Sequence, residues 1–539
     1  MTATPPARPT PPTPPTPPAP APRRTLADRL LAALGGLAAG YGGLAVAALV
    51  AVLVRPEAGP IAAVGDWVVD RSPTGVKEWA IRTFGENDKT VLEAGIMVLL
   101  AVLAALIGLL ALRSLPAAAL VVAALGVVGM LAAVTRPDST SAADALPSLA
   151  GAAACAAVLY VLTRRLTVPR PAATAPDRRG FLLTGAGAVA GATGTLFLAR
   201  SVGATRSENA GASRDALRLP RPASPAPAVP PGAQLPVDGI SPFVTPNGDF
   251  YRVDTALVVP RLDATSWRLR VHGTGVPRER VFTLPELMRR EVVERDVTLA
   301  CVSNEVGGSL VGNARWLGVR LADLLRECGV RPPSRGGPAD QIVARSADGM
   351  TIGSPVETVM DGRDALLAFG MNGEPLPFAH GFPVRMVVPG LYGYVSACKW
   401  ITSIELTTFA AYDAYWVPRG WAAQAPVKTE SRIDTPKAFS KVTAGPAPVA
   451  VAGVAWAQHR GISRVQLRVD DGPWQDAELG TEDSRDTWRQ WVYRWHPTPG
   501  KHTLTVRATD GTGTVQTEQR ADTMPDGATG WHSIEVTAH

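Results

Sequence analysis

Hydrophobic residues are concentrated in four long stretches in the first third of the chain. These stretches cover residues 26–54, 91–112, 116–134 and 146–162. Each holds about the 20 residues that an α-helix needs to cross the ~30 Å hydrocarbon layer of a bilayer. The pattern therefore predicts a region of four transmembrane helices within residues 26–163.

Arginines at the ends of these stretches predict their orientation. They precede the first stretch, lie in the short loop between the second and third, and follow the fourth. By the positive-inside rule these ends face the cytoplasm, and the loop 55–90 faces outward. Its Trp67 and Trp79 fit either a segment resting at the membrane surface or a plain external loop. The flanking arginines are Arg23, Arg24, Arg29, Arg113, Arg164, Arg165 and Arg170.

A fifth, weaker apolar segment follows a pair of arginines at residues 178–179. The sequence RRGFLL leads into a span rich in Gly, Ala and Thr. Two arginines before a weakly hydrophobic segment resemble a twin-arginine export signal, which is read by a receptor rather than acting as an anchor itself. Because no A-x-A cleavage site follows, residues 178–200 are predicted to remain as a fifth membrane helix.

Two proline-rich segments are predicted to lack a core. Residues 1–25 are almost entirely Pro, Thr and Ala, which indicates a disordered tail. Residues 201–233 are rich in Pro, Ala and Ser and are expected to form an external linker.

The remaining chain shows two further patterns. Residues 234–427 interleave short Val/Leu/Ile-rich strands with short helices and many Gly/Pro turns, which predicts an α+β domain. Residues 428–539 show short alternating strands, such as those at 449–457 and 502–510, separated by turns. That pattern is typical of a β-sandwich.

Composition excludes several classes of partner and cofactor. The net charge of +6 is modest for 539 residues and comes from the arginine clusters beside the apolar stretches, so no nucleic-acid partner is predicted. Four scattered cysteines form neither a disulfide framework nor a CxxC or CxxCH motif. All seven histidines lie outside the predicted spans, so no haem is expected in this chain.

Cys301 is the first candidate for chemistry. A strand-like stretch at residues 297–300 delivers it into a loop rich in Ser, Asn and Gly. A thiol in that position suits a metal ligand or a nucleophile, whereas a lone cysteine is more often a buried structural residue. The residue alone leaves these alternatives open.

The sequence around Cys301 resembles the molybdenum-binding segment of the sulfite oxidase family. In that family a loop cysteine is followed by Asn and then by an A-R-W-x-G-x-R-L segment. Here these are Cys301, Asn304 and ARWLGVRL at 314–321. The resemblance extends over residues 234–539 and implies an α+β molybdopterin domain like that of sulfite oxidases.

A second block strengthens the resemblance. The sequence HGFPVRMVVPG, followed by KW, matches the family pattern H-G-x-P-x-R-x-V-x-P-G through His380, Arg385 and Lys399. The terminal GWHSIEV resembles the close of the family's immunoglobulin-like dimerisation domain. This implies an immunoglobulin-like β-sandwich at 428–539 and leaves a homodimer open.

The resemblance implies a molybdenum-pyranopterin cofactor with Cys301 as the metal ligand. Such a centre exchanges one oxygen atom and two electrons with a small-molecule substrate. Carried over position by position, the resemblance also implies a set of cofactor-binding residues. These are Tyr251, Arg252, Asn304, Asp348, His380, Arg385, Ser396 and Lys399.

Three departures from the family concern the substrate. Residues 253–255 replace an Arg-Asn-His run whose arginine faces the substrate anion, and Glu305 stands where the family has arginines. Trp421 replaces the catalytic tyrosine, while Arg315 and Arg419 remain as cations. A pocket with fewer cations is expected to bind sulfite poorly. The predicted catalytic residues are Cys301, Trp421 and Arg315.

Together these features predict a membrane-anchored molybdopterin-dependent oxidoreductase. It is expected to be a multi-pass protein of the cell membrane with its catalytic domain on the extracytoplasmic side. Its electrons are expected to pass to a separate cytochrome or quinone-linked carrier. Two alternatives stay open: a sulfoxide or oxyanion reductase fed by a membrane cytochrome, and a non-catalytic cofactor-binding scaffold.

Overall fold

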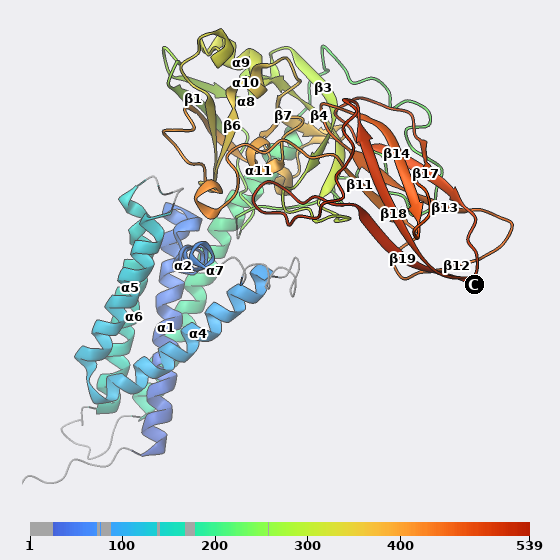
Figure 1. Ribbon diagram of the computed structural model, residues 1–539. Coiled ribbons are helices and arrows are strands. Elements are labelled where there is room, and N and C mark those ends of the chain that lie inside the picture. Colours follow the sequence, from blue (N-terminus) through green and yellow to red (C-terminus); the bar gives the residue numbers. More distant parts are fainter. Residues whose placement is uncertain are drawn as a thin grey trace, which may run out of the picture. The chain divides into compact units, whose positions relative to one another are not determined.

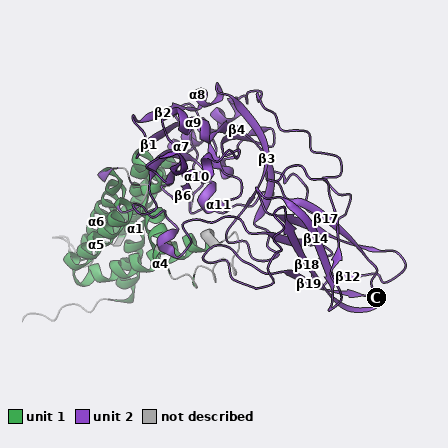
Figure 2. Ribbon diagram, turned by 45° about the horizontal axis from the view of Figure 1, so that its top comes forward, with its two compact units in different colours: residues 1–134, 143–199 green, residues 135–142, 200–539 purple. Residues whose placement is uncertain are grey.

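The computed structural model (Figure 1) describes residues 25–72, 76, 88–136, 139, 141–167, 178–256 and 258–539. The chain divides into two compact units (Figure 2). One comprises residues 1–134 and 143–199, and the other comprises residues 135–142 and 200–539. Apart from Thr25, the predicted proline-rich tail lies outside the described residues, as does Trp79.

Helices make up the described part of the first unit. They are α1 (Leu26–Val54), α2 (Pro60–Arg71), α4 (Asp88–Arg113), α5 (Leu115–Val134), α6 (Leu146–Thr167) and the beginning of α7 (Arg178–Ala216). In the described part of the chain, α1, α4, α5, α6 and α7 are long and apolar enough to cross a membrane. Helices therefore form where the apolar stretches predict them.

Small residues let the helices of the first unit approach closely. A side chain at Gly36 of α1 would collide with the carbonyl oxygen of Ala104 and lie 2.9 Å from Cα of Gly108, both on α4. Close approach at glycine is typical of helix pairs in membranes, where packing rather than water exclusion drives association. At the end of α1, Arg55 pairs with the buried Asp144 (Nη2–Oδ2, 2.7 Å).

Helix α7 is longer than the sequence pattern predicts. It continues to Ala216 and so takes in the first half of the range expected to be a linker. The physical reason is that residues 201–216 contain no proline and several good helix formers, and the first proline comes at residue 220. Near its end, Arg214 donates to the carbonyl oxygens of Pro375 (2.7 Å) and Leu376 (2.8 Å).

The second unit begins with two sheets and four short helices. One sheet has the order β2-β1-β10-β5-β6 and the other β3-β4-β7-β8, with β9 also paired to β7. This mixture agrees with the predicted α+β pattern. The strands are β1 (Arg268–Gly273), β2 (Arg280–Thr283), β3 (Val292–Ala300), β4 (Val311–Arg320), β5 (Gln341–Ser346), β6 (Thr351–Pro355), β7 (Leu366–Met371), β8 (Glu374–Pro375), β9 (Arg385–Val387) and β10 (Ile401–Thr407). The helices are α8 (Leu284–Met288), α9 (Leu321–Glu327), α10 (Val356–Met360) and α11 (Gly393–Ser396).

Two more sheets complete the second unit, with the orders β11-β13-β17-β16 and β12-β19-β18-β14-β15. One hydrophobic core receives side chains from both, including Val451 and Trp491 from the first and Leu467, Leu504 and Val536 from the second. The immunoglobulin-like assignment stays a prediction. The strands are β11 (Glu430–Thr435), β12 (Lys441–Val442), β13 (Val449–Trp456), β14 (Ile462–Val469), β15 (Gln475–Asp476), β16 (Glu478–Leu479), β17 (Arg489–Trp495), β18 (Gly500–Asp510) and β19 (His532–Ala538).

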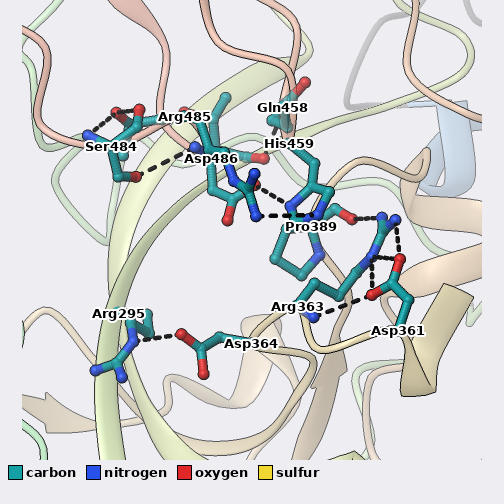
Figure 3. A network of polar contacts seen from close by, with 12 residues as sticks. Arg295, Asp361, Arg363, Asp364, Pro389, Gln458, His459, Ser484, Arg485 and Asp486 are labelled. Atoms are coloured by element: carbon teal, nitrogen blue, oxygen red, sulfur yellow. Dashed lines mark hydrogen bonds and ion pairs between the residues drawn. The ribbon is translucent and has the colours of Figure 1, made fainter.

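Residues 428–539 pack directly on the α+β part. Trp456 and Trp488 belong to the same buried core as the side chains of β3, β4 and β7. Beside this core, Arg363 donates from Nη1 to the carbonyl oxygen of Pro389 (2.6 Å). Figure 3 shows His459 next to this turn, paired with Asp486. The contact between the two parts therefore combines buried tryptophans with hydrogen bonds such as that from Gln458 Nε2 to the carbonyl oxygen of Thr298 (2.9 Å).

Candidate functional site

Cys301 lies directly after β3, at the start of the loop that leads to β4. Its backbone N–H donates to the carbonyl oxygen of Leu310 (2.9 Å), and the residue is only 7% exposed. Burial raises the pKa of the Cys301 thiol, while hydrogen bonds from Ser303 and the positive charge of Lys399 act in the opposite direction. Since a metal binds the thiolate, a soft metal at this sulfur would offset the effect of burial.

Tyr251 lies beside Cys301 in a cluster of aromatic rings. Burial and the neighbouring Cys301 raise the pKa of the Tyr251 hydroxyl, and Arg385 lowers it. The Tyr251 ring stacks on Phe250 (centroids 5.2 Å apart), and Phe250 meets the His380 ring edge-on at 5.5 Å. The cluster therefore connects the cysteine to the second sequence block.

Arg385 and His380 form the cationic side of this group. Arg385 is buried, its Cζ lies 4.9 Å from the centre of the Trp316 ring, and its Nη1 donates to the carbonyl oxygen of His380 (3.2 Å). Among the described residues its buried Nε has no hydrogen-bond partner. A buried donor without a partner is costly, so this nitrogen is suited to an anionic ligand.

Their surroundings keep Arg385 charged and His380 neutral at neutral pH. Burial lowers the pKa of Arg385 to about 10, which leaves it a cation at neutral pH. Burial, together with Arg385, lowers the pKa of His380 to about 4. The neutral His380 ring donates from Nε2 to the carbonyl oxygen of Asn247 (2.9 Å), so its Nδ1 is free to accept.

Asp254 joins two of the predicted cofactor-binding cations. Its Oδ2 accepts from Lys399 Nζ (2.9 Å) and from Arg252 Nε (2.8 Å), and its side chain is 2% exposed. Burial lowers the pKa of Lys399 to about 8, although Asp254 acts against this. From the sequence, Asp254 is expected only as part of the run that replaces Arg-Asn-His. The signal for its pairing role is a carboxylate two residues after Arg252.

The remaining predicted cofactor-binding residues are Asp348, Ser396 and Asn304. Burial raises the pKa of the Asp348 carboxyl group. The nearby negative charge of Asp254 also raises it, and the positive charge of Lys399 lowers it. The Ser396 hydroxyl donates within the chain, to the carbonyl oxygens of Leu391 and Tyr392 (both 3.0 Å). Asn304 supports the cysteine loop, since its Oδ1 accepts from the backbone N–H of Leu310 (2.8 Å).

The structure does not bring Arg315 into this group. Arg315 donates to both carboxylate oxygens of Asp296, at 2.9 and 2.6 Å. Successive strand residues point to opposite faces, so Arg315 points away from the face on which Trp316 meets Arg385. Its charge is therefore already paired on the other side of β4.

Trp421 belongs to a row of half-buried aromatic rings. Its ring lies 5.8 Å from Tyr394 of α11 and 6.4 Å from Trp416, which in turn meets Tyr415 at 5.0 Å. Arg419 stacks on Tyr415 at 3.6 Å. Trp421 thus touches the helix whose first residue, Gly393, lies near the Tyr251 hydroxyl.

In the described part of the chain, no group of three or more His, Cys, Asp or Glu side chains could hold a metal ion by itself.

Residues 256–416 match the family model described as an oxidoreductase molybdopterin binding domain. This range contains Cys301 and the second sequence block, whereas Tyr251, Arg252 and Trp421 lie outside it.

The chain is also similar to curated proteins over part of their length. The chain is 29% identical over 342 residues to mitochondrial sulfite oxidase of Rattus norvegicus, a match that covers 54% of this chain and 61% of that protein. It is 31% identical over 290 residues to mitochondrial sulfite oxidase of Mus musculus, covering 46% and 52%. It is 35% identical over 197 residues to nitrate reductase [NADH] 1 of Oryza sativa subsp. japonica, covering 32% and 21%. The chain thus spans about half to three fifths of the sulfite oxidases it matches.

Among solved structures, the chain is similar to the sulfane dehydrogenase SoxCD from Paracoccus pantotrophus. The sequence identity is 25%, the TM-score is 0.45, and the match covers 52% of this chain and 75% of that one.

Proposed function

We propose that the chain is a membrane-anchored, molybdenum-dependent oxidoreductase of the sulfite oxidase family. The match of residues 256–416 to an oxidoreductase molybdopterin binding domain and the similarity to mitochondrial sulfite oxidases support this. In this proposal Cys301 is the protein ligand of the metal. The enzyme transfers an oxygen atom to or from a small molecule and exchanges two electrons with a separate carrier.

The observation that carries the proposal is the buried Nε of Arg385, which has no hydrogen-bond partner among the residues that the structure describes and lies beside the group that contains Cys301. Arg385 would bind the anionic phosphate of a pyranopterin, with Lys399 as a second cation and neutral His380 as an acceptor for a ring N–H. The thiolate of Cys301, which is a soft ligand, would bind molybdenum, the metal that transfers oxygen. When bound, the cofactor supplies the oxygen-atom transfer and holds the electrons.

Membrane anchoring is supported by the five long apolar helices in the described part of the chain. The arginines that flank them favour a cytoplasmic location for the chain before α1 and after α6. In the proposal α7 crosses once more, so the second unit lies outside the cytoplasm. A carrier in or beside the membrane, such as a cytochrome or a quinone-linked protein, would receive or supply the electrons.

A second candidate is a reductase of sulfoxides. It is favoured by Asp254, which already pairs with Arg252 and Lys399 and so leaves less positive charge for a free oxyanion. An uncharged substrate needs no such cations. The row of rings at Trp421 and Trp416 would suit a substrate with an apolar part.

The test is to purify the full chain in detergent from a host that makes the cofactor and to measure molybdenum by mass spectrometry. We expect close to one metal ion per chain and dye-coupled turnover of sulfite or of a sulfoxide. Absence of molybdenum would contradict the proposal. Bound molybdenum without turnover of any tested oxyanion or sulfoxide would favour the scaffold alternative.

A further inference from the structure

Strand β3, which leads directly into Cys301, lies at the edge of its sheet, and residues from the C-terminal part cover the end of that edge nearest to Cys301. The sheet has the order β3-β4-β7-β8, so one side of β3 has no neighbouring strand within the sheet. At Thr298, three residues before Cys301, the backbone N–H donates to the carbonyl oxygen of Asp486 (3.0 Å). The carbonyl oxygen of Thr298 accepts from Gln458 Nε2 (2.9 Å), and its hydroxyl accepts from the N–H of Trp488 (2.7 Å).

The loop that follows Cys301 is held from the same side by strand β11. Arg432 donates from Nη1 to the carbonyl oxygen of Gly308 (2.7 Å). Its other nitrogens are fixed as well, since Nε donates to Asp434 (2.6 Å) and Nη2 to the hydroxyl of Ser241 (2.9 Å). Arg432 is 9% exposed, so this guanidinium is a buried, three-way hydrogen-bonding group.

Two further contacts support the middle of the loop. Asn304 donates from Nδ2 to Glu430 Oε2 (3.5 Å), and the other oxygen of Glu430 accepts from the Tyr392 hydroxyl (3.0 Å). Gly307 adopts φ of 81°, and a side chain there would collide with the ring of His532. The loop from Cys301 to Leu310 is therefore enclosed by residues of β11 and β19.

From these contacts we infer that residues 428–539 position the metal-binding cysteine, and that Arg432 is the principal positioning residue. Arg432 touches neither metal nor substrate. It fixes the part of the loop around Gly308 through a hydrogen bond. Glu430 fixes the part next to Cys301 through its hydrogen bond with Asn304. The inference rests on the proposed function only in naming molybdenum as the partner of Cys301, because the placement of the thiol can be measured without the metal.

The experiment measures how fast iodoacetamide alkylates Cys301 in the cofactor-free full chain, made in a host that cannot synthesise the pyranopterin. Peptide mass spectrometry separates Cys301 from Cys155, Cys328 and Cys398. Because Cys301 is buried, alkylation requires the loop to open. We expect Arg432→Ala to raise the rate about tenfold, which reports a loop that opens more often.

The matched control is Arg460→Ala. Arg460 also pairs with an aspartate, Asp510, and also donates to a backbone carbonyl, that of Val427, but neither partner lies in the cysteine loop. We expect this variant to leave the alkylation rate of Cys301 unchanged. Equal rates in wild type and Arg432→Ala would overturn the inference, and so would an equal increase in both variants.

A second variant and a second readout keep the test decisive. If Arg432→Ala does not fold, Arg432→Lys keeps a charge beside Asp434 but cannot reach Asp434, Gly308 and Ser241 together. We then expect an intermediate increase of about threefold in the alkylation rate of Cys301, and no increase would overturn the inference.

In chain loaded with molybdenum, Arg432→Lys should also shift the electron paramagnetic resonance spectrum of the reduced metal, whereas Arg460→Ala should not. If wild-type chain binds no molybdenum, the proposed function fails while the alkylation comparison still decides this inference.

Discussion

At the scale of single residues, Cys301 and Cys328 offer a direct comparison. Both thiols are buried, but Cys328 lies at the end of α9, within the hydrophobic core. We expect Cys301→Ser to lower dye-coupled activity by about 100-fold or more, because a metal ligand is lost. Pterin content should change little, since Arg385 and Lys399 bind the phosphate in our proposal. Cys328→Ser should keep the activity. Wild-type turnover in Cys301→Ser would remove this residue from the metal site.

Asp254 is predicted to decide how well an oxyanion binds. In Asp254→Asn the Arg252 cation, which takes no part in the proposed phosphate site, loses the carboxylate that pairs it. A charge-assisted hydrogen bond that Arg252 then forms to sulfite contributes about 1.5–3 kcal/mol, so the KM for sulfite should fall about tenfold or more. The assay is run near pH 6.5 so that Lys399, whose pKa is raised by Asp254 and falls without it, still carries its charge at the phosphate. Asp323→Asn, which changes an exposed pair with Arg326, is the control. An unchanged KM would show that Arg252 does not face the substrate.

His532 is predicted to make stability depend on pH. Burial, followed by the nearby Arg432, lowers the pKa of His532 from 6.5 to about 4, and its Nδ1 accepts from the N–H of Ile433 (3.0 Å). The unfolded chain therefore binds more protons between these values, and stability falls as the pH drops from about 6.5 towards 4. From pH 7 to pH 5 this amounts to about 2 kcal/mol. His532→Asn keeps a hydrogen-bond acceptor that is not protonated in this pH range. Guanidinium unfolding followed by tryptophan fluorescence should therefore show a smaller loss of stability from pH 7 to pH 5 in this variant than in wild type. An equal loss in both proteins would contradict this assignment.

At the scale of elements, the packing of α1 on α4 can be tested at its closest point. Gly36→Ala places a methyl group against the backbone of α4 at Ala104 and Gly108. Overpacking of this kind costs about 1–3 kcal/mol, so the melting temperature in detergent should fall. Gly95 provides the matched control, because it lies within α4 with nothing within 4 Å of an added Cβ. Gly95→Ala should be neutral or slightly stabilising, since alanine favours helix. Equal melting temperatures for Gly36→Ala and wild type would mean that α1 and α4 do not approach closely there.

The elements also show what the sequence could and could not predict. Local patterns were sufficient for the apolar helices, for the strand before Cys301 and for the alternating C-terminal strands, because each depends on neighbouring residues. The extent of α7 differs from the prediction because residues 201–233 are rich in Pro, Ala and Ser when taken together, although their first part, residues 201–216, contains no proline. The pairing of Arg315 with Asp296 and the covering of β3 at Thr298 depend on residues far apart in the chain. No local pattern could indicate them.

At the scale of the whole molecule, the proposed topology, together with cofactor insertion in the cytoplasm, requires the second unit to cross the membrane after it has folded. Arg178 and Arg179 stand at the beginning of α7, whose Gly-, Ala- and Thr-rich first part is only mildly apolar. If a receptor reads this pair, replacing both arginines with lysine removes the address while keeping the charge. We therefore expect the double variant to leave the second unit in the cytoplasm, where protease added to intact spheroplasts cannot reach it.

The matched control for that experiment lies at the end of α6. Lysine at both Arg164 and Arg165 also keeps the charge, but it changes a pair that should act only through the positive-inside rule. This control should leave the second unit accessible to external protease. If the Arg178 and Arg179 variant is equally accessible, α7 inserts by the ordinary route. The second unit is then exported before it has bound a cofactor, and it either stays without one or acquires it outside the cytoplasm. Molybdenum content measured on the same preparations separates these two outcomes, because only a chain that acquires its cofactor outside is recovered with the metal.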